Sequence, residues 1–315
     1  MTEKNSPYLV LAYYQIAPIK DAQKEVLTHK DFFKGRDITS RIYISEDGIN
    51  GQMCASYQDA EDYITWMSAR EEFKEMAFKL TPHHEQAFPR LVVKYRKQLV
   101  AFTRKLNLEK RGVHVSPAEW KRMLQEKNEK IVIDVRNQYE WKVGRFEGAN
   151  LPPCETFRDF DKYAEELKEK VDPKKTAVMM YCTGGIRCEF YSAALMEHGF
   201  EKVYQLEGGV INYGNEEGSK HWLGKLFVFD DRLVVPISNE KTEVIGTCHH
   251  CKTAFEAYYN CANMECNQLF ICCKDCLETY LGCCCTECKN AKRVRPYHHQ
   301  NHKPFLRLHH YREKI

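Results

Sequence analysis

The stretch Ala177-Val-Met-Met-Tyr181-Cys182-Thr-Gly-Gly-Ile-Arg187-Cys188 decides the fold. Its first part, up to Tyr181, carries no charge and no turn former, which predicts a short buried strand. The two glycines that follow predict a turn, and a helix is expected from about residue 187 until Gly199 ends it. In a parallel α/β sheet, ligands bind at the carboxyl ends of the strands. Cys182 therefore lies where a ligand site is expected.

The residues on either side of this stretch continue the alternation of strand and helix. Ile131–Val135 and Lys202–Leu206 are predicted strands. Ser116-Pro-Ala-Glu119 has the pattern of a capping box with proline at the first helical position, so a helix is predicted to begin there. Strands that alternate with helices indicate a mostly parallel sheet covered on both faces. We expect an α/β domain over residues 113–235.

The loop from Cys182 to Arg187 has the features of a cradle for an anionic sulfur. Backbone N–H groups of the loop and of the helix N-terminus would point toward the sulfur and lower its pKa, because they stabilise the thiolate. Gly184 and Gly185 allow the backbone to fold tightly round an anion, with Thr183 and Ile186 completing the loop. The alternative is a buried structural cysteine beside an ordinary turn. The order strand, cysteine, glycines, arginine and helix favours a reactive thiol, with Arg187 adding positive charge.

The N-terminal part of the chain follows another pattern. Its predicted order is β-α-β-β-α-β, with strands over 8–16, 38–45, 49–56 and 77–80 and helices over 21–33 and 58–73. Asp47-Gly48 between the two middle strands is a turn signal. This order is typical of small ferredoxin-like sandwiches. We expect a ferredoxin-like α+β domain over residues 1–84.

Residues 85–112 are expected to connect the two domains, with local strands near 91–95 and 99–102. The connector is basic, because eight lysines and arginines stand against Glu85 and Glu109 alone. It is either a solvated linker or a surface that contacts nucleic-acid phosphates, which lysine and arginine neutralise.

Cysteine is strongly clustered, since 11 of the 15 cysteines lie between positions 248 and 288. Short loops that end in two thiolates suit tetrahedral zinc, and four such pairs would fill two structural sites. A segment this short buries too little apolar surface to fold without metal. An iron–sulfur cluster and a metal-free segment are the alternatives. We expect a zinc module over residues 236–290, with these ligands: Cys248, Cys251, Cys261, Cys266, Cys273, Cys276, Cys284 and Cys288.

Three cysteines, Cys272, Cys283 and Cys285, are left over beside these pairs, which leaves the ligand register within their runs open. His249 and His250 are expected to be neighbours of the module rather than ligands. Residues 291–315 form a basic tail, which is either an RNA-binding arm or a solvated segment.

Composition bounds the class of protein. The chain has 315 residues, 43% of them hydrophobic and 29% charged, which predicts more than one globular domain. The net charge of +3 identifies no partner. No stretch is long and apolar enough for a membrane span, and no basic leader precedes the apolar run from Tyr8 to Ala17. We therefore expect a cytoplasmic protein with no membrane partner.

The loop from Cys182 to Arg187 resembles the active loop of rhodanese domains. Further motifs occur in the rhodanese order, namely Ile133-Asp134-Val135-Arg136 with Tyr139-Glu140, the Gly144–Pro152 stretch and Leu206-Glu-Gly-Gly-Val210. The resemblance implies a rhodanese-like fold in which Asp134 and Arg136 support the loop. Cysteine phosphatases instead need five residues between the cysteine and the arginine. Here that register ends on Cys188, so phosphatase activity is disfavoured.

A wider resemblance joins Ser45-Glu-Asp-Gly-Ile-Asn-Gly51, the motif from Cys182 to Glu189 and the C-terminal cysteine pattern. Together they are similar to the bacterial tRNA uridine hydroxylases with a central rhodanese domain. This resemblance implies oxygen-dependent conversion of the wobble uridine, position 34 in the tRNA anticodon loop, to 5-hydroxyuridine. It implies O2 as co-substrate and Cys182 as the essential residue, acting as a thiolate or as a persulfide.

Two other functions stay open. One is a sulfurtransferase that carries sulfur on Cys182 as a persulfide, and the other is a non-catalytic tRNA-binding protein. The motifs favour an enzyme, and no flavin or haem motif is visible in the sequence.

Overall fold

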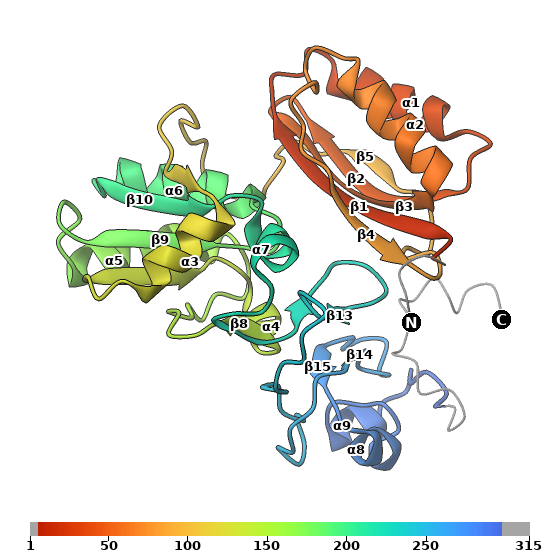
Figure 1. Ribbon diagram of the computed structural model, residues 1–315. Helices are drawn as coiled ribbons and strands as arrows, with labels where there is room; N and C mark the ends of the chain where they lie inside the picture. Colours follow the sequence, from red (N-terminus) through yellow and green to blue (C-terminus); the bar gives the residue numbers. More distant parts are fainter. Residues whose placement is uncertain (1–5, 298–315) are drawn as a thin grey trace.

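A computed structural model describes residues 6–297. In Figure 1 the chain forms an N-terminal part drawn in red and orange, a central part in yellow and green, and a C-terminal part in cyan and blue. The predicted zinc-module residues lie within the described range, as does the start of the basic tail. The rest of the tail, residues 298–315, lies outside the described residues.

The N-terminal part confirms the predicted β-α-β-β-α-β order. Its elements are β1 (Tyr8–Ile16), α1 (Ala22–Phe33), β2 (Ile38–Ser45), β3 (Gly48–Ser56), α2 (Tyr57–Ser68) and β4 (Lys79–His83). With the later strand β5 (Val93–Tyr95), the sheet order is β4-β1-β3-β2-β5, and both helices cover the same face (Figure 1). The helix α2 ends at Ser68 rather than at the expected residue 73, but Phe73 is still buried against the sheet.

Alternation along the strands divides this sheet into two unlike faces. Leu9, Leu11 and Tyr13 on β1 pack into the core beneath the helices. Successive side chains on a strand point to opposite faces, so Ala12 and Tyr14 lie on the other face. The helices leave that second face free to meet another part of the molecule.

The predicted connector is not a solvated linker in this structure. Its first expected strand is β5 (Val93–Tyr95), which pairs in parallel with β2 and completes the N-terminal sheet. The strand expected near 99–102 does not form. Leu99 and Phe102 instead pack into the core of the central part, because their large apolar side chains are buried there. The segment therefore joins the two parts by contributing to both cores.

The central part confirms the predicted α/β domain. Four parallel strands lie in the order β6-β10-β9-β7, and helices cover both faces of this sheet. Ser116 begins the first helix by accepting a hydrogen bond from the backbone N–H of Glu119, at 3.3 Å. The elements are β6 (Val113–Val115), α3 (Pro117–Gln125), β7 (Lys130–Asp134), α4 (Gln138–Trp141), β8 (Gly144–Phe146), α5 (Asp159–Lys170), β9 (Ala177–Tyr181), α6 (Ile186–Glu197), β10 (Lys202–Leu206) and α7 (Gly209–Glu217).

The C-terminal part is built from short elements and loops. These are β11 (Trp222–Gly224), β12 (Leu226–Phe227), β13 (Val234–Val235), β14 (Tyr258–Asn260), β15 (Leu269–Ile271), α8 (Lys274–Thr279) and α9 (Thr286–Lys289). The strand β11 pairs with β8 of the central part, and the Tyr258 hydroxyl donates to the backbone oxygen of Tyr139 at 2.5 Å. Within residues 6–297, no helix has both the length and the apolar character that a membrane span requires.

Candidate active site

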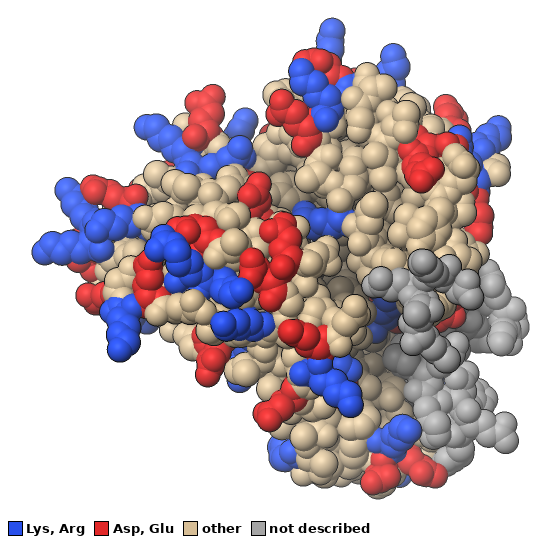
Figure 2. All heavy atoms as spheres, viewed as in Figure 1, with Lys and Arg blue, Asp and Glu red and all other residues tan. Residues whose placement is uncertain are grey.

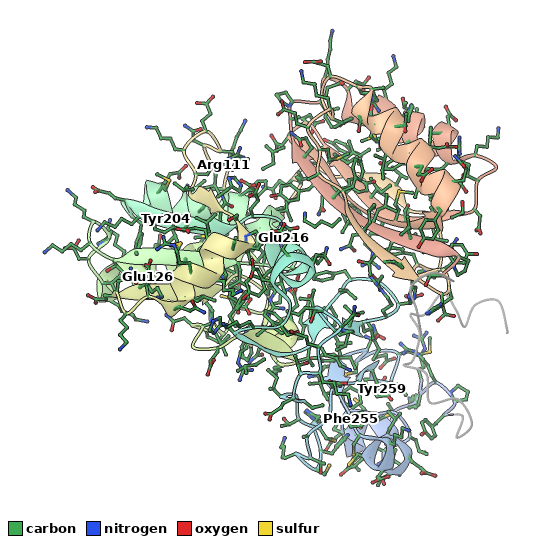
Figure 3. All side chains as sticks on the ribbon, viewed as in Figure 1. Arg111, Glu126, Tyr204, Glu216, Phe255 and Tyr259 are labelled. Carbon is green, nitrogen blue, oxygen red and sulfur yellow. The ribbon has the colours of Figure 1, made fainter. Side chains whose placement is uncertain are left out.

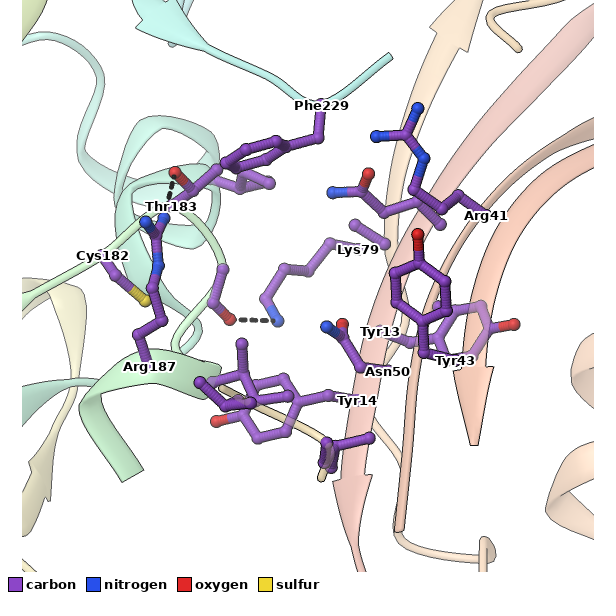
Figure 4. Close-up of a pocket in the computed structure, with 18 of the residues that line it drawn as sticks. Tyr13, Tyr14, Arg41, Tyr43, Asn50, Lys79, Cys182, Thr183, Arg187 and Phe229 are labelled. Carbon is purple, nitrogen blue, oxygen red and sulfur yellow. Dashed lines mark hydrogen bonds between the residues drawn. The ribbon is translucent and has the colours of Figure 1, made fainter. Parts of the chain in front are cut away.

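A cavity of about 410 Å³ lies where the helix-free face of the N-terminal sheet meets the loop between β9 and α6 (Figure 4). The central part contributes Cys182, Thr183, Gly184, Ile186 and Arg187 to its lining. Strands β1 to β4 contribute polar and aromatic side chains from the opposite side. The site therefore lies between two domains, at the carboxyl end of β9.

Cys182 is fully buried at the end of β9, and its surroundings stabilise the thiolate. The backbone N–H of Gly185 donates to its Sγ at 3.1 Å. Burial opposes ionisation, but the Cys188 thiol, the Arg187 charge and backbone N–H groups outweigh it and lower the pKa of Cys182 to about 6. Cys182 is therefore mostly ionised at neutral pH.

Cys188 faces Cys182 from the first turn of α6 and has the opposite tendency. Burial and the neighbouring Cys182 sulfur raise its pKa well above the usual value for a thiol. Cys188 thus stays protonated and can donate its S–H to the Cys182 thiolate. The pair is one thiolate and one thiol.

Arg187 does not point freely at the sulfur, because it is held by a buried carboxylate. Its guanidinium contacts Glu140 of α4 at 2.5 and 2.8 Å, and Thr183 Oγ1 donates to the same carboxylate at 3.1 Å. Burial opposes ionisation of Glu140, but Arg187 holds the pKa of that carboxyl below its usual range. Glu140 belongs to a motif of the rhodanese resemblance but was not a predicted site residue; in the structure it fixes the arginine beside the loop.

Only one of the two loop glycines needs to be glycine for conformational reasons. Gly185 has φ +105°, and a Cβ there would lie 3.0 Å from the Tyr14 hydroxyl. A Cβ on Gly184 would meet no atom within 4 Å. Because Gly184 lines the cavity, a side chain there would occupy space that the glycine leaves open.

Two contacts tie the N-terminal sheet to the active loop. Lys79 Nζ donates to the backbone oxygen of Gly184 at 3.1 Å, and the Tyr14 hydroxyl donates to Glu189 at 2.8 Å. Burial lowers the pKa of Lys79 to about 8, while the Cys182 thiolate acts in the opposite direction. His114 and Arg111 also contact Glu189, at 2.8 and 3.2 Å; Arg111 is labelled in Figure 3. These contacts place a cation beside the loop that carries Cys182.

Polar and aromatic side chains cover the sheet face opposite the loop. Arg41, Tyr43, Asn50, Gln52 and Lys79 all line the cavity, and most are labelled in Figure 4. None was a predicted site residue. The available signal was that polar residues recur at every second position of the middle strands, on a face that their own domain leaves uncovered.

Asp134 and Arg136 lie behind the loop rather than in the cavity. Both are fully buried, and their charged groups are 2.6 Å apart. The Tyr181 hydroxyl donates to Asp134 at 2.6 Å, and Arg136 donates to the backbone oxygen of Gly144 at the same distance. The pair therefore braces the end of β9, next to Cys182, and a supporting role for these two residues stays a prediction.

The surface around the cavity mixes charges of both signs. In Figure 2 lysine and arginine alternate with aspartate and glutamate over this face, and basic side chains also lie in the hollow between the N-terminal and central parts. A smaller groove of about 270 Å³ shares Arg41 and Tyr43 with the cavity and continues past Arg90 and Lys94.

The eight predicted metal ligands gather in two groups of four. One group holds Cys248, Cys251, Cys273 and Cys276, and the other holds Cys261, Cys266, Cys284 and Cys288. Within each group the sulfur atoms lie within 4.8 Å of one another. The three surplus cysteines belong to neither group, and the His250 ring stacks on Tyr280 at 3.7 Å.

The donor chemistry of both groups fits a tetrahedral metal ion. Backbone N–H groups of Cys273 and Cys284 donate to Cys248 Sγ and Cys261 Sγ, each at 3.4 Å. Such donors favour thiolate ligands, and four thiolates are a common ligand set of structural zinc. Around them Tyr259, labelled in Figure 3, and Phe270 form a small apolar core.

Comparison with known proteins agrees with this organisation. The UPF0176 acylphosphatase like domain matches residues 8–99, the rhodanese-like domain 116–216 and the rhodanase C-terminal model 223–289. A tRNA uridine(34) hydroxylase of Protochlamydia amoebophila is 60% identical over 305 residues, which are 96% of this chain and 95% of that protein. The chain belongs to the tRNA uridine(34) hydroxylase family.

Further relatives of the same name come from Chlamydia abortus and Chlamydia trachomatis serovar D. Each is 52% identical, and the matches cover 96% and 98% of this chain and 93% and 94% of the relatives. Family membership confirms the predicted resemblance, and the rhodanese-like match spans the loop that carries Cys182.

Proposed function

We propose that this chain is an oxidoreductase that hydroxylates C5 of the wobble uridine in tRNA and uses O2. The observation that carries the proposal is an ionised cysteine in a nucleotide-sized cavity, in a chain 60% identical to a tRNA uridine(34) hydroxylase over nearly its whole length. Ligand cavities of enzymes commonly span about 300–1,000 Å³, a range that includes this one.

The reaction replaces the C5–H bond of uracil with C5–OH. One oxygen atom of O2 enters the base and the other leaves as water, so an external two-electron reductant and two protons complete the balance. Position 34 is unpaired in the anticodon loop, and turning its base out of the stack costs a few kcal/mol or less. The cavity would then receive one base rather than paired RNA.

Cys182 has the chemistry to activate C5. Its thiolate would add to C6 of the ring, forming an S–C6 bond and moving the C5=C6 electron pair into an enolate with nucleophilic carbon at C5. After C5 is hydroxylated, loss of the C5 proton and of the sulfur restores the double bond. In the persulfide alternative, Cys182 carries an outer sulfur atom and its own Sγ never bonds to the ring.

Anticodon stem-loop RNA with 5-fluorouridine at position 34 separates these two roles. Fluorine at C5 cannot leave as the proton does, so ring attack should leave a covalent adduct that mass spectrometry maps to Cys182. Intact RNA binding with no adduct would contradict ring attack and favour the persulfide.

The two cysteine groups would hold two zinc ions with a structural role. All eight ligands are cysteines, which leaves no position for a substrate, and Tyr258 connects the module to α4. The ions would fix the fold of the module and, through α4, the position of Glu140 beside the active loop.

Nucleoside mass spectrometry tests the proposed reaction. Transfer RNA from cells that carry the gene should contain 5-hydroxyuridine or products made from it, and tRNA from cells without the gene should lack them. If thiolated uridine is present in cells with the gene and missing from cells without it, the sulfurtransferase is favoured, to which the rhodanese-like match also points. Unchanged nucleosides in both strains would favour a non-catalytic protein.

A further inference from the structure

We propose that the helix-free face of the N-terminal sheet reads the uracil base, with Asn50 and Gln52 hydrogen-bonding its imide edge and the flanking cations its carbonyl oxygens. The imide edge is the run of O4, N3–H and O2. This inference rests on the proposed function and adds to it the residues that select the base. It places the chemistry on the central part and the recognition on the N-terminal part.

The strand register brings the reading residues together in two neighbouring rows. In one row Asn50 of β3 pairs with Tyr14 of β1 on one side and with Tyr43 of β2 on the other. Residues that pair across antiparallel strands have Cβ atoms about 4.5–5.5 Å apart. Asn50 is therefore an amide between two aromatic rings that can contact the faces of a base.

In the second row Gln52 lies between a small residue and a cation. It pairs with Ala12 of β1 and with Arg41 of β2, and Ala12 pairs in turn with Lys79 of β4. The short side chain of Ala12 leaves room over the sheet between Lys79 and Gln52. The row thus presents an ammonium, a gap, an amide and a guanidinium toward the Cys182 loop.

Three of these side chains have no protein partner in the part of the chain that the structure describes. Asn50, Gln52 and Arg41 take part in no side-chain hydrogen bond or ion pair there, although all three line the cavity. By contrast, the buried amide of Gln205 donates to the backbone oxygen of Gly112 at 2.9 Å. Polar groups that enter a closed site without a partner lose their hydration, so a ligand edge that pairs with them stabilises the complex.

The pattern of donors and acceptors matches uracil better than cytosine. Lys79 and Arg41 can only donate, and a carboxamide can accept from N3–H. Uracil offers carbonyl oxygens at both ends of its edge with a donor between them. Cytosine instead presents an amino group at C4, which would face a donor-only cation and leave it without an acceptor.

Stem-loop RNAs with uridine, 3-methyluridine or cytidine at position 34 test the inference. The methyl group removes the N3–H donor and adds an apolar group at the same edge, so an amide can no longer pair with N3. The wild type should bind and hydroxylate the uridine RNA about tenfold better than either analogue, because one lost hydrogen bond costs up to about tenfold. Asn50→Ala and Gln52→Ala should each lose about tenfold on uridine and almost nothing on 3-methyluridine.

The control variant is Gln58→Ala, which removes an amide from the surface of α2, where it contacts Asp62. It should keep the wild-type discrimination, and circular dichroism should show the same fold for all three variants. If Asn50→Ala and Gln52→Ala both still prefer the uridine RNA over the 3-methyluridine RNA as strongly as the wild type does, the inference is overturned. Binding is measured by fluorescence anisotropy without turnover. A wild type that discriminates in binding but makes no hydroxyuridine would therefore contradict the proposed function and support base reading.

Discussion

At the scale of single residues, we assign the chemistry to Cys182, whose state of ionisation is measurable. A pKa of about 6 means that the thiolate predominates above that pH and is lost as the pH falls through it. The stabilising groups are fixed by the loop, so the low pKa belongs to the folded protein. The same residue in an unfolded chain would ionise near the ordinary value for cysteine, about 8.5.

We predict that the ultraviolet thiolate absorbance of the wild type, minus that of Cys182→Ser, rises with a midpoint near pH 6. The rate of hydroxylation should fall along the same curve toward acid pH. Cys188→Ser is the matched control, because a hydroxyl also donates to the thiolate, and it should keep substantial activity. A midpoint near 8.5, or equal loss of activity from both serine variants, would contradict the assigned roles.

Sequence reasoning identified Cys182 because its motif is local, with strand, cysteine, glycines and helix adjacent in the chain. It did not identify Lys79, whose partner Gly184 lies 105 positions away. It also did not identify Asn50, which faces the Cys182 loop across the cavity from another domain. Gly184 was given a conformational role that the structure assigns to Gly185 alone. A sequence pattern shows where a backbone turns, but not which side of the turn meets another domain.

At the scale of elements, the N-terminus of α7 packs directly on the active loop. The backbone N–H groups of Val210 and Ile211 donate to the carbonyl oxygens of Cys182 and Thr183, at 3.0 and 3.1 Å. Gly209 makes this close approach possible, because a Cβ there would lie 2.6–2.7 Å from the loop backbone.

Gly209→Ala should therefore displace the loop, raise the pKa of Cys182 and reduce hydroxylation at least tenfold. Gly148→Ala is the control, since Gly148 has a similar φ of +70° but open space around its Cβ position. It should cost only the backbone strain of about 1–2 kcal/mol and leave the pKa of Cys182 unchanged. Similar effects of both changes on that pKa would contradict the contact.

The edge strand β5 and the residues before it form a basic border beside the cavity. Arg90 and Lys94 are exposed and line the groove that shares Arg41 with the cavity. Arg96 lies over the Tyr43 ring at 4.8 Å. This position favours the phosphate-contacting alternative for the basic segment over a solvated linker.

The double variant Arg90→Ala/Lys94→Ala should bind the anticodon stem-loop about tenfold more weakly. The slope of log affinity against log salt concentration should also be shallower, by about 0.7 for each lost phosphate contact. The double variant Lys168→Ala/Lys170→Ala on α5 removes the same charge from exposed positions outside the groove and should change neither quantity. An unchanged salt slope in the first variant would contradict a role for this border.

The helices and most strands of the two larger domains were predictable, since their apolar spacing and caps are local signals. The strand β5 was predicted only as a local strand of the connector, because nothing within residues 91–95 shows that its partner is β2. The absent strand near 99–102 has a related cause. The apolar residues in that segment suggested a strand, but they are buried because they pack against the central core. Local spacing does not reveal this packing.

At the scale of the whole molecule, the cysteine module is connected to the active site through α4. Tyr258 of the module contacts the backbone of α4, and Glu140 of the same helix holds Arg187. Both cysteine groups lie in this module. Metal binding would therefore act on the fold of the module first and on the active loop second.

Elemental analysis should find about two zinc ions per chain. Strong chelation should increase hydrogen exchange first over the zinc module, residues 236–290, then in α4, and last in the N-terminal sheet. Iron with a visible absorbance band would contradict the zinc assignment. Exchange that starts in the N-terminal sheet would contradict the structural role of the module.

The site between domains could not be predicted as a whole, although each domain could. Tyr14 and Glu189 belong to different domains, and only the folded molecule brings the Tyr14 hydroxyl to 2.8 Å from that carboxylate. The cavity exists because one sheet face lacks helices and one loop ends a parallel strand. Its location unites the recognition and the chemistry that we assign to the protein.

Photo-crosslinking tests most directly whether this cavity holds the wobble base. An anticodon stem-loop with 4-thiouridine at position 34 is bound to the wild type, irradiated and digested, and the linked peptides are mapped by mass spectrometry. If the cavity holds the base, links form to cavity residues of β1, β3 or the loop from Cys182 to Arg187, and no such links form when the thiouridine is placed in the stem. Links from position 34 only to the cysteine module or to surfaces outside the cavity would contradict this placement.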